Sequence, residues 1–374
     1  MKKVLAFAAL ALALTACGGP KTVRIGYIGP LTGDAASYGA DTLNAVRMHV
    51  DEINAAGGIG GKQIELIAED SRCNGADSAS AVQKLVNVDK VIGIIGGQCS
   101  SETLAAAPIV EAAKIVMISP VSSSPDVTKA GDFVFRVYPS DAFKGKVLAW
   151  ILSTQGYNKI AILSENTDFC LGIRNTVKAN LKEGGSLVFD EMVDPGTKDF
   201  RTLATRLKAL DFDALIINGQ SDSVNAEMAK QARDLGVKQP LFGTDTSDSA
   251  TLAVLAKDAV EGMTFINTSS TLGDNGAGSF GDRFRQQFGE PKANLSFATL
   301  AYDALGVMAD AVRKVGTAGP VMRDYLYGLG QAGGYEGAAG TLGFDSDGDV
   351  VGVGYAIKQF KDGKIVEINR VAAE

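Results

Sequence analysis

Short β-branched runs alternate with longer amphipathic stretches along most of this 374-residue chain. The run 23–28 has strand character, and the stretch 38–56 that follows places Leu43, Val46 and Val50 on one helical face. Strand–helix–strand alternation implies right-handed crossovers and a parallel sheet covered by helices on both faces. The pattern therefore predicts an α/β fold.

The alternation runs in two series. The first predicts strands at 23–28, 63–68, 91–95 and 115–118, and helices at 38–56, 76–88 and 101–113. The second predicts strands at 160–163, 187–192, 214–217, 240–242 and 262–266, and helices at 141–156, 171–183, 200–210, 224–235, 281–288 and 297–315. A chain of this length exceeds what one hydrophobic core serves, so we expect two lobes. A β-hairpin turning at 361–364, where Asp-Gly supplies positive φ angles, closes the chain.

The N-terminus has the features of an export signal. Met1–Lys3 is basic, and the apolar run 4–14 is shorter than the roughly 20 residues that span a bilayer. The residues Leu14–Cys17 resemble the lipobox of bacterial lipoproteins, which implies removal of residues 1–16 and acylation of Cys17. The alternative is an ordinary cleaved signal with an incidental cysteine. We expect a lipid anchor at the bacterial cell envelope, outside the cytoplasmic membrane.

The charge of the chain argues against one class of partner. The formal net charge is −7, and loss of Lys2 and Lys3 with the signal takes it to −9. An acidic chain without a basic run is not suited to binding nucleic acid through its phosphates.

Residues for catalysis or metal binding do not form a recognisable pattern. The single histidine, His49, falls inside the first predicted helix, without the partners of a nucleophilic site. No C-x-x-C or paired histidine suggests a metal, and Asp345–Asp349 departs from a calcium loop and is interpreted as a turn before a strand. We therefore expect no enzyme activity, no metal and no cofactor.

Small polar residues follow the strand at 91–95. The segment 94–102 passes directly from strand to helix, and ligands of open α/β sheets settle at the carboxyl ends of strands. Ser100 and Ser101 would place hydroxyls beside free helix N–H groups, which suits a carboxylate. The alternative is plain helix capping by these serines, with Glu102 in the first turn.

Two further loops follow strands in the same way. The segment 118–125 contributes Val121, Ser122 and Ser123, and 242–246 contributes Asp245 from the second series. An anion cradle on one lobe and a carboxylate on the other would suit a zwitterion held between them. Taken alone, Asp245 would also suit a turn or cap residue.

A set of motifs occurs in one order along the chain. They are Ile28–Gly33 with Tyr38–Gly39, Asp51–Lys62, Cys73, Cys99–Ser101, Ser119–Pro120, Lys198–Phe200, Tyr302–Ala304 and Gly340–Asp345. By these motifs, residues 22 to 370 resemble the substrate-binding proteins of branched-chain amino-acid ABC importers, the Leu/Ile/Val-binding family with the type I periplasmic binding protein fold.

The resemblance implies an architecture and partners. Two doubly wound αβα lobes, joined by three crossover segments, would consist of residues 22–138 with 268–353 and of 139–267 with 354–374. Hinge closure would capture an amino acid or a similar small amide or carboxylate. The protein would be a monomer that delivers this ligand to an ABC permease with its ATPase subunits.

The resemblance also implies roles for individual residues. Ser100 and Ser123 would hold the α-carboxylate of the ligand. The backbone carbonyl of Val121 and the side chain of Asp245 would receive its α-ammonium, and Tyr38 would cover its side chain. Asp245 stands where family members often have glutamate.

Two departures leave the solute open. Phe169 and Gln220 occupy positions where amino-acid binders of the family often place tyrosines, so the pocket wall differs. Aliphatic or aromatic amino acids, amides, urea and aromatic acids all remain candidates.

The family's disulfide would join Cys73 to Cys99, and export permits it. A disulfide that closes the loop 73–99 would stabilise the fold by roughly 3–4 kcal/mol on chain-entropy grounds. Cys170 would then be a buried apolar residue or a free thiol.

Other classes of function stay open at this point. An envelope regulatory or sensor protein could use the same fold to bind a protein partner. An exported hydrolase has no nucleophile–base pair to support it.

Overall fold

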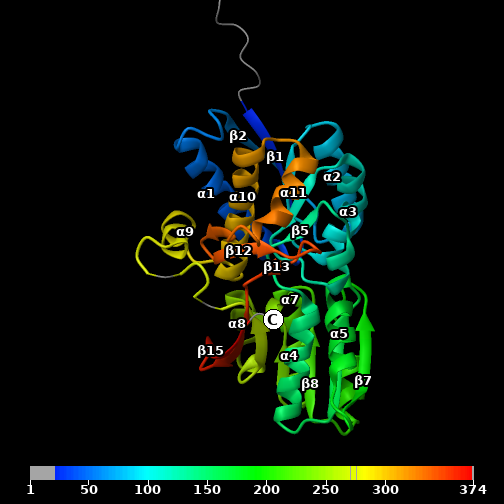
Figure 1. Ribbon diagram of the computed structural model, residues 1–374. Helices are drawn as coiled ribbons and strands as arrows, with labels where there is room; N and C mark the ends of the chain where they lie inside the picture. The colour runs from blue at the N-terminus through cyan, green and yellow to red at the C-terminus, as the bar shows by residue number, and fades with distance from the viewer. Residues whose placement is uncertain (1–21, 270, 275, 373–374) are drawn as a thin grey trace, which may run out of the picture.

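The computed structural model describes residues 22–269, 271–274 and 276–372. The expected signal, residues 1–16, and the expected lipidation site Cys17 lie outside the described residues. The chain forms two lobes, each built around its own sheet, stacked one above the other in Figure 1.

The first lobe contains a parallel sheet in the order β2-β1-β3-β4-β5. Its strands are β1 (Thr22–Gly29), β2 (Gln63–Asp70), β3 (Gly93–Ile95), β4 (Val116–Ser119) and β5 (Val134–Arg136). Its helices are α1 (Ala36–Ala55), α2 (Gly75–Asn87), α3 (Ser100–Ala113), α9 (Phe280–Phe288), α10 (Leu295–Val315) and α11 (Gly319–Leu329). A small antiparallel sheet of β11 (Tyr335–Gly337), β12 (Gly340–Phe344) and β13 (Val350–Val351) packs beside α10 and α11.

The second lobe contains a sheet in the order β15-β14-β10-β9-β8-β6-β7. Its strands are β6 (Lys159–Glu165), β7 (Ser186–Val193), β8 (Ala214–Asn218), β9 (Leu241–Gly243), β10 (Thr264–Asn267), β14 (Tyr355–Lys361) and β15 (Lys364–Val371). Its helices are α4 (Asp141–Thr154), α5 (Asp168–Asn180), α6 (Arg201–Lys208), α7 (Asp222–Asp234) and α8 (Ala250–Ala256). Within this sheet β14 pairs antiparallel with both β10 and β15, and the other neighbouring strands pair in parallel.

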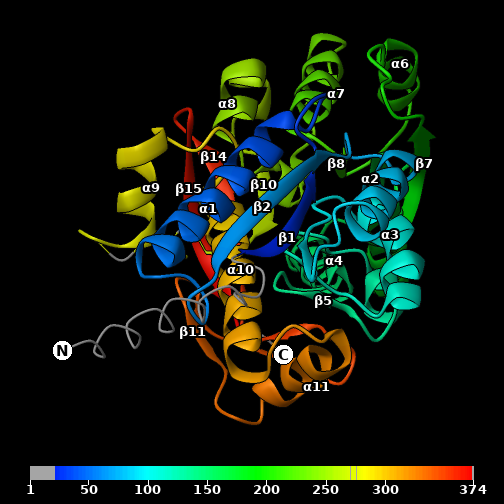
Figure 2. The same cartoon turned by 90° about the horizontal axis from the view of Figure 1, so that it is seen from above.

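Helices cover both faces of each sheet. In the first lobe α1, α10 and α11 pack on one face, and α2 and α3 on the other; Figure 2 shows β1 and β2 running between α1 and the α2–α3 pair. In the second lobe α4 and α5 cover one face, and α6, α7 and α8 the other. Helix α10 is long and apolar enough to cross a membrane by composition, but 94% of that stretch is buried inside the fold. It is therefore the core helix of the first lobe.

The chain passes between the two sheets three times. It leaves the first sheet after β5 for α4, leaves the second sheet after β10 for α9, and leaves β13 for β14. These segments lie side by side: Tyr138 Oη donates to Asn267 Oδ1 at 2.7 Å, and Tyr355 Oη donates to the carbonyl of Pro139 at 3.0 Å. The connection between the lobes is therefore a hydrogen-bonded cluster of three short segments.

The α/β fold class expected from the alternation is confirmed, and the elements of both series fold as predicted to within a few residues. Helices α8 and α11, strand β5 and strands β11 and β12 of the small sheet were not predicted, whereas β13 is the strand expected after the turn at Asp345–Asp349. Each is short or begins at glycine and proline, as α11 does at Gly319 and Pro320, so the periodic signal on which the prediction rests is weak there.

Candidate ligand-binding site between the lobes

Helix α3 begins at the edge where strand β3 ends, facing the second lobe. Gly96 and Gly97 turn the chain from the strand, and Cys99 occupies the N-cap position. Its own side chain is committed to a disulfide, and the carboxylate of Glu102 folds back onto the helix start instead. The first turn is therefore capped without using a serine.

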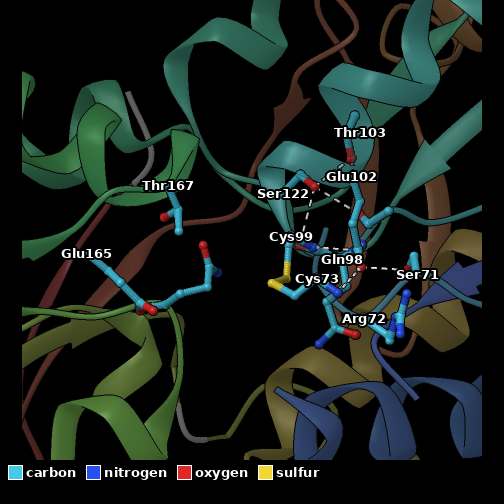
Figure 3. Close-up of a disulfide and its surroundings, with 12 residues drawn as sticks. Ser71, Arg72, Cys73, Gln98, Cys99, Glu102, Thr103, Ser122, Glu165 and Thr167 are labelled. Atoms are coloured by element: carbon cyan, nitrogen blue, oxygen red, sulfur yellow. Dashed lines mark hydrogen bonds between the residues drawn. A yellow bond between two sulfur atoms is a disulfide. The ribbon is translucent and has the colours of Figure 1, made fainter. Parts of the chain in front are cut away.

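Glu102 joins three segments of the first lobe (Figure 3). One oxygen accepts from the backbone N–H of Gln98 at 2.8 Å and of Cys99 at 2.9 Å. The other accepts from the Ser71 hydroxyl at 2.5 Å and from the Cys73 N–H at 2.8 Å. Burial raises the pKa of Glu102, and the four donors oppose that shift. This network fixes the helix start against the loop that carries Cys73.

Ser100 and Ser101 occupy the first turn of α3 without serving as its cap. Ser100 is buried, and its Oγ accepts from the N–H of Ser124 at 3.1 Å, which leaves its hydroxyl hydrogen able to donate. The first N–H groups of a helix have no intrahelical acceptor and carry partial positive charge. The helix start thus presents donors to a negatively charged group.

The loop after β4 forms hydrogen bonds with this helix start. Ser122 Oγ donates to the carbonyl of Gly97 at 2.8 Å and lies 2.6 Å from Thr103 Oγ1, as part of the packing around α3 (Figure 3). Ser123 Oγ donates to Asp141 Oδ2 at 2.9 Å, which joins this loop to helix α4 of the second lobe.

A small cavity lies between the lobes at this point. Its lining comes from both lobes: Tyr38, Gln98, Cys99, Ser100, Val121, Ser123, Phe169, Gln220, Asp245, Thr246 and Phe297. Its volume is about 20 Å³, against the roughly 10–15 Å³ that one water molecule needs. A larger solute therefore requires the walls to move apart.

Two amide side chains in the cavity wall each have one buried atom without a hydrogen-bond partner. Gln98 Nε2 is a donor and Gln220 Oε1 an acceptor, and neither is paired among the described residues. Gln98 is 4% exposed, and its Oε1 lies 2.9 Å from the hydroxyl of Thr42. Unpaired buried polar atoms are rare in native proteins, so these two atoms are available to form hydrogen bonds with a solute in the cavity.

The wall of the second lobe carries a buried charge cluster. Lys144 Nζ lies 2.6 Å from Asp245 Oδ1 and 2.7 Å from Asp141 Oδ1, and all three side chains are at most 3% exposed. Burial lowers the pKa of Lys144, but the two carboxylates outweigh this effect and raise it overall. Burial raises the pKa of Asp141, and Lys144 opposes that shift. The ammonium group is therefore charged.

Aromatic rings complete the surroundings of this ammonium. Lys144 Nζ lies 5.0 Å from the ring centre of Tyr138, 5.5 Å from that of Phe169 and 5.7 Å from that of Tyr355. A cation over ring faces at such distances is attracted by their quadrupoles. Lys144 thus lies in a cage of two carboxylates and three rings, directly behind the cavity-lining Asp245 and Phe169.

Contacts between the lobes close the cavity. Tyr38 Oη, from α1, donates to the carbonyl of Thr246 in the second lobe at 3.0 Å, while the Tyr38 ring packs edge-on against Phe297 of its own lobe at 5.7 Å. Ser37 Oγ donates to Asp222 Oδ2 at 3.2 Å, farther out on the same side. The structure therefore has the lobes in contact around the site.

An open cleft of about 530 Å³ leads outward from the cavity, between the lobes. Ser101 lines this cleft, and Gln220 lines both the cleft and the inner cavity. The Cys73–Cys99 disulfide lies at its first-lobe rim, and Figure 3 shows Glu165 and Thr167 on the opposite side.

The structure brings together most of the residues singled out from the sequence. Those that line the inner cavity are Tyr38, Ser100, Val121, Ser123, Phe169, Gln220 and Asp245. Ser101 lies in the outer cleft, and Ser122 supports the loop without lining either space. The sequence reasoning missed Gln98, Asp141, Lys144, Thr246 and Phe297. Gln98 lies inside the predicted loop 94–102 but was not singled out, and nothing in the sequence around Lys144 signals that this lysine is buried.

Contacts in the structure test the predictions about the cysteines and His49. The disulfide Cys73–Cys99 is confirmed, with a Cα–Cα distance of 5.4 Å, and Cys170 is a buried free thiol whose pKa burial raises. His49 stacks on Tyr302 at 3.7 Å, and its Nδ1 lies 2.7 Å from the Tyr302 carbonyl, as a structural residue. Within the part of the chain that the structure describes, no group of His, Cys, Asp and Glu side chains is arranged to hold a metal ion.

Two αβα lobes in contact around an inner cavity define a protein that binds a solute between its lobes. Residues 22–364 match the family described as periplasmic binding protein. The chain belongs to this family, whose description implies a location outside the cytoplasmic membrane.

Individual proteins that are similar to this chain are amino-acid-binding proteins. The chain is 28% identical over 351 residues to the leucine-, isoleucine-, valine-, threonine- and alanine-binding protein of Pseudomonas aeruginosa, covering 93% of this chain and 92% of that one. A leucine-binding protein from Thermotoga maritima superposes with a TM-score of 0.85 at 25% identity, over 93% of this chain and 98% of that chain. The branched-chain amino-acid transporter substrate-binding protein of Streptococcus pneumoniae, solved with isoleucine, superposes with a TM-score of 0.84 at 29% identity. The match covers 94% of this chain and 99% of that chain. The type I periplasmic binding protein fold expected from the resemblance is thereby confirmed.

Proposed function

We propose that this chain is the extracytoplasmic solute receptor of an ABC importer, and that it encloses an amino acid or a similar small carboxylate between its lobes. The observation that carries the proposal is the inter-lobe cavity, lined by the start of α3 on one side and by Phe169 and Asp245 on the other. The amino-acid ligands of the relatives support the same class of solute.

The first lobe supplies the donors for a carboxylate. The Ser100 hydroxyl and the unpaired Gln98 Nε2 both line the cavity, beside the free N–H groups of the first turn of α3. A charged hydrogen bond in a desolvated site contributes about 1.5–3 kcal/mol. The Ser123 hydroxyl already donates to Asp141, so Ser123 positions the loop beside the carboxylate site and does not donate to the solute.

Apolar side chains enclose the rest of the solute. Tyr38, Val121, Phe169 and Phe297 line the cavity from both lobes and exclude water when the lobes close. Gln220, with its unpaired Oε1, offers one polar contact to a hydroxyl, amide or amino group.

Binding and closure are coupled through the segments that join the lobes. We assign residues 22–138 and 268–353 to one lobe and residues 139–267 and 354–374 to the other, with the hinge at the three crossings. The Tyr38–Thr246 hydrogen bond forms only when the lobes meet. A solute that binds both lobes therefore stabilises the closed form, in which this bond is present. The closed surface then docks on a membrane permease, which its ATPase subunits drive.

The chain acts as a receptor without catalysis. Cleavage before Cys17 and its acylation anchor the protein at the envelope, and the mature chain works as a monomer. The relatives named above are likewise binding proteins.

A thermal-shift panel on the mature domain tests the proposal. The panel contains amino acids, amides, urea, and aliphatic and aromatic acids. A ligand at 100 times its dissociation constant stabilises by about 2.7 kcal/mol, which is a readily measured rise in melting temperature. Absence of any shift across the panel, with scattering that shows permanently closed lobes, contradicts the proposal.

A further inference from the structure

The charge of Asp245 is already matched inside the protein. This carboxylate is the acidic group in the cavity wall, and its Oδ1 lies 2.6 Å from the ammonium of Lys144. The ammonium is held in turn by Asp141 and is 1% exposed, so in this structure solvent does not compete with Asp245 for it.

The surroundings of Lys144 are those expected for a bound ammonium ligand. Carboxylates at 2.6 and 2.7 Å and the ring centres of Tyr138, Phe169 and Tyr355 within 5.7 Å surround it. Aromatic cages with acidic groups are a general way to recognise cationic nitrogen. Here the protein fills the cage with its own side chain.

A solute with an α-ammonium group meets this wall at a disadvantage. To bind Asp245 it would share a carboxylate with Lys144 and place two positive charges within a few ångströms of each other, in a buried site where solvent screens them weakly. The opposite end of the cavity is unaffected, because the Ser100 hydroxyl and Gln98 Nε2 still offer donors to a carboxylate.

We propose that Lys144 is a positioning residue that sets specificity by occupying the ammonium site, so that this receptor prefers small apolar carboxylates without an amino group. This inference rests on the proposed function and specifies its substrate class. The carboxylate binds at the start of α3, and the hydrocarbon part lies against Phe169 and Phe297.

Matched pairs of solutes test the inference by calorimetry at neutral pH. The pairs are valine and isovalerate, leucine and isocaproate, and phenylalanine and hydrocinnamate. For the wild-type mature domain, at least one des-amino member is expected to bind about tenfold or more tightly than its amino acid. The ratio within a pair cancels effects of size and of overall stability.

Removing the internal ammonium should reverse the preference. Lys144→Met alone leaves two unpaired buried carboxylates, which threatens folding, so the decisive variant is Lys144→Met with Asp141→Asn. It leaves Asp245 as one free carboxylate, and the ratio should move toward the amino acid by about tenfold or more. The matched control is the double variant Lys358→Met with Asp248→Asn, which replaces another buried ion pair, with Lys358 Nζ 2.6 Å from Asp248 Oδ2, whose residues do not line the cavity. Its ratio should stay within about threefold of the wild type.

The outcomes separate this inference from the proposed function. If the wild type prefers the amino-acid members, or if the double variant keeps the wild-type ratio, Lys144 does not set specificity and the receptor function stands. If no carboxylate, amino acid or amide binds the wild type at all, the receptor function and this inference fall together.

Discussion

Lys144 Nζ lies 2.6 Å from Asp245 Oδ1, and this ion pair joins helix α4 to the loop that follows strand β9. The pair places a fixed cation behind the second-lobe wall of the cavity. The two walls therefore differ less in charge than the polar residues of the loops alone suggest, and the proposed carboxylate site at α3 would be the main polar anchor for a solute.

Ser100→Ala should weaken the binding of any carboxylate hit from the panel by roughly 10- to 100-fold, because a charged hydrogen bond contributes about 1.5–3 kcal/mol. Calorimetry measures the change. The matched control is Ser101→Ala, one residue along the helix in the outer cleft. Its affinity should stay within about threefold of the wild type, and equal losses in the two variants would remove Ser100 from the site.

Tyr38→Phe should favour the open form. The variant loses the hydrogen bond from Tyr38 Oη to the Thr246 carbonyl, which bridges the lobes at 3.0 Å. A loss of about 1 kcal/mol predicts roughly fivefold weaker ligand binding and a larger radius of gyration without ligand. Small-angle scattering and calorimetry check both effects.

Tyr27→Phe is the control for Tyr38→Phe. Tyr27 Oη lies 2.7 Å from Thr42 Oγ1 entirely within the first lobe. This variant should lower the melting temperature and leave the radius of gyration unchanged. Equal scattering changes in the two variants would show that the Tyr38 hydroxyl does not control closure.

Glu102→Gln should destabilise the first lobe by roughly 2–4 kcal/mol. Four donors converge on the Glu102 carboxylate, and a glutamine would turn its own NH₂ group toward two of them. Urea denaturation gives the free energy of unfolding. The exposed Glu65→Gln, which loses an ion pair with Arg24, should cost less than about 1 kcal/mol, and a similar cost for both would mean that the Glu102 network contributes no special stability.

Asp303 should make the protein less stable as the pH rises. Burial raises the pKa of Asp303 to about 7, although the N–H groups of Ala338 and Ala339 donate to it at 2.7 Å. An unfolded aspartate titrates near pH 3.9, so the folded state binds more protons between about pH 4 and pH 7, and the free energy of unfolding falls as the pH rises through that window.

Asp303→Asn should remove that contribution. Between pH 5 and pH 8 the wild type should lose about 2–3 kcal/mol more stability than the variant does. Denaturation curves at the two pH values give the comparison. Parallel pH dependence in the two proteins would contradict the assignment to Asp303.

The elements that carry the site were predictable because their signals are local. The β-branched strands and the amphipathic stretch that became α1 have clear periods, and Ser100 follows a buried strand at the edge where ligands of such folds bind. The resemblance then predicted the Cys73–Cys99 disulfide and assigned Tyr38 and Asp245 to one ligand site.

What the sequence could not reveal depends on pairing over long separations. Lys144 and Asp245 are 101 residues apart, and Arg136, fully buried, pairs with Asp349 at 2.7 Å across 213 residues. A lysine is rarely buried unless it is paired, so nothing near Lys144 predicts that it lies buried behind a ligand cavity. Charge pairing of this kind appears only when the fold brings the elements together.

A crystal structure of the mature domain with the tightest-binding solute from the panel tests the account most directly. The predicted result is a carboxylate about 3 Å from Ser100 Oγ and Gln98 Nε2, enclosed by both lobes, with Lys144 still paired to Asp245. A solute bound outside the inter-lobe cavity, or a ligand ammonium that has displaced Lys144 from Asp245, would contradict it.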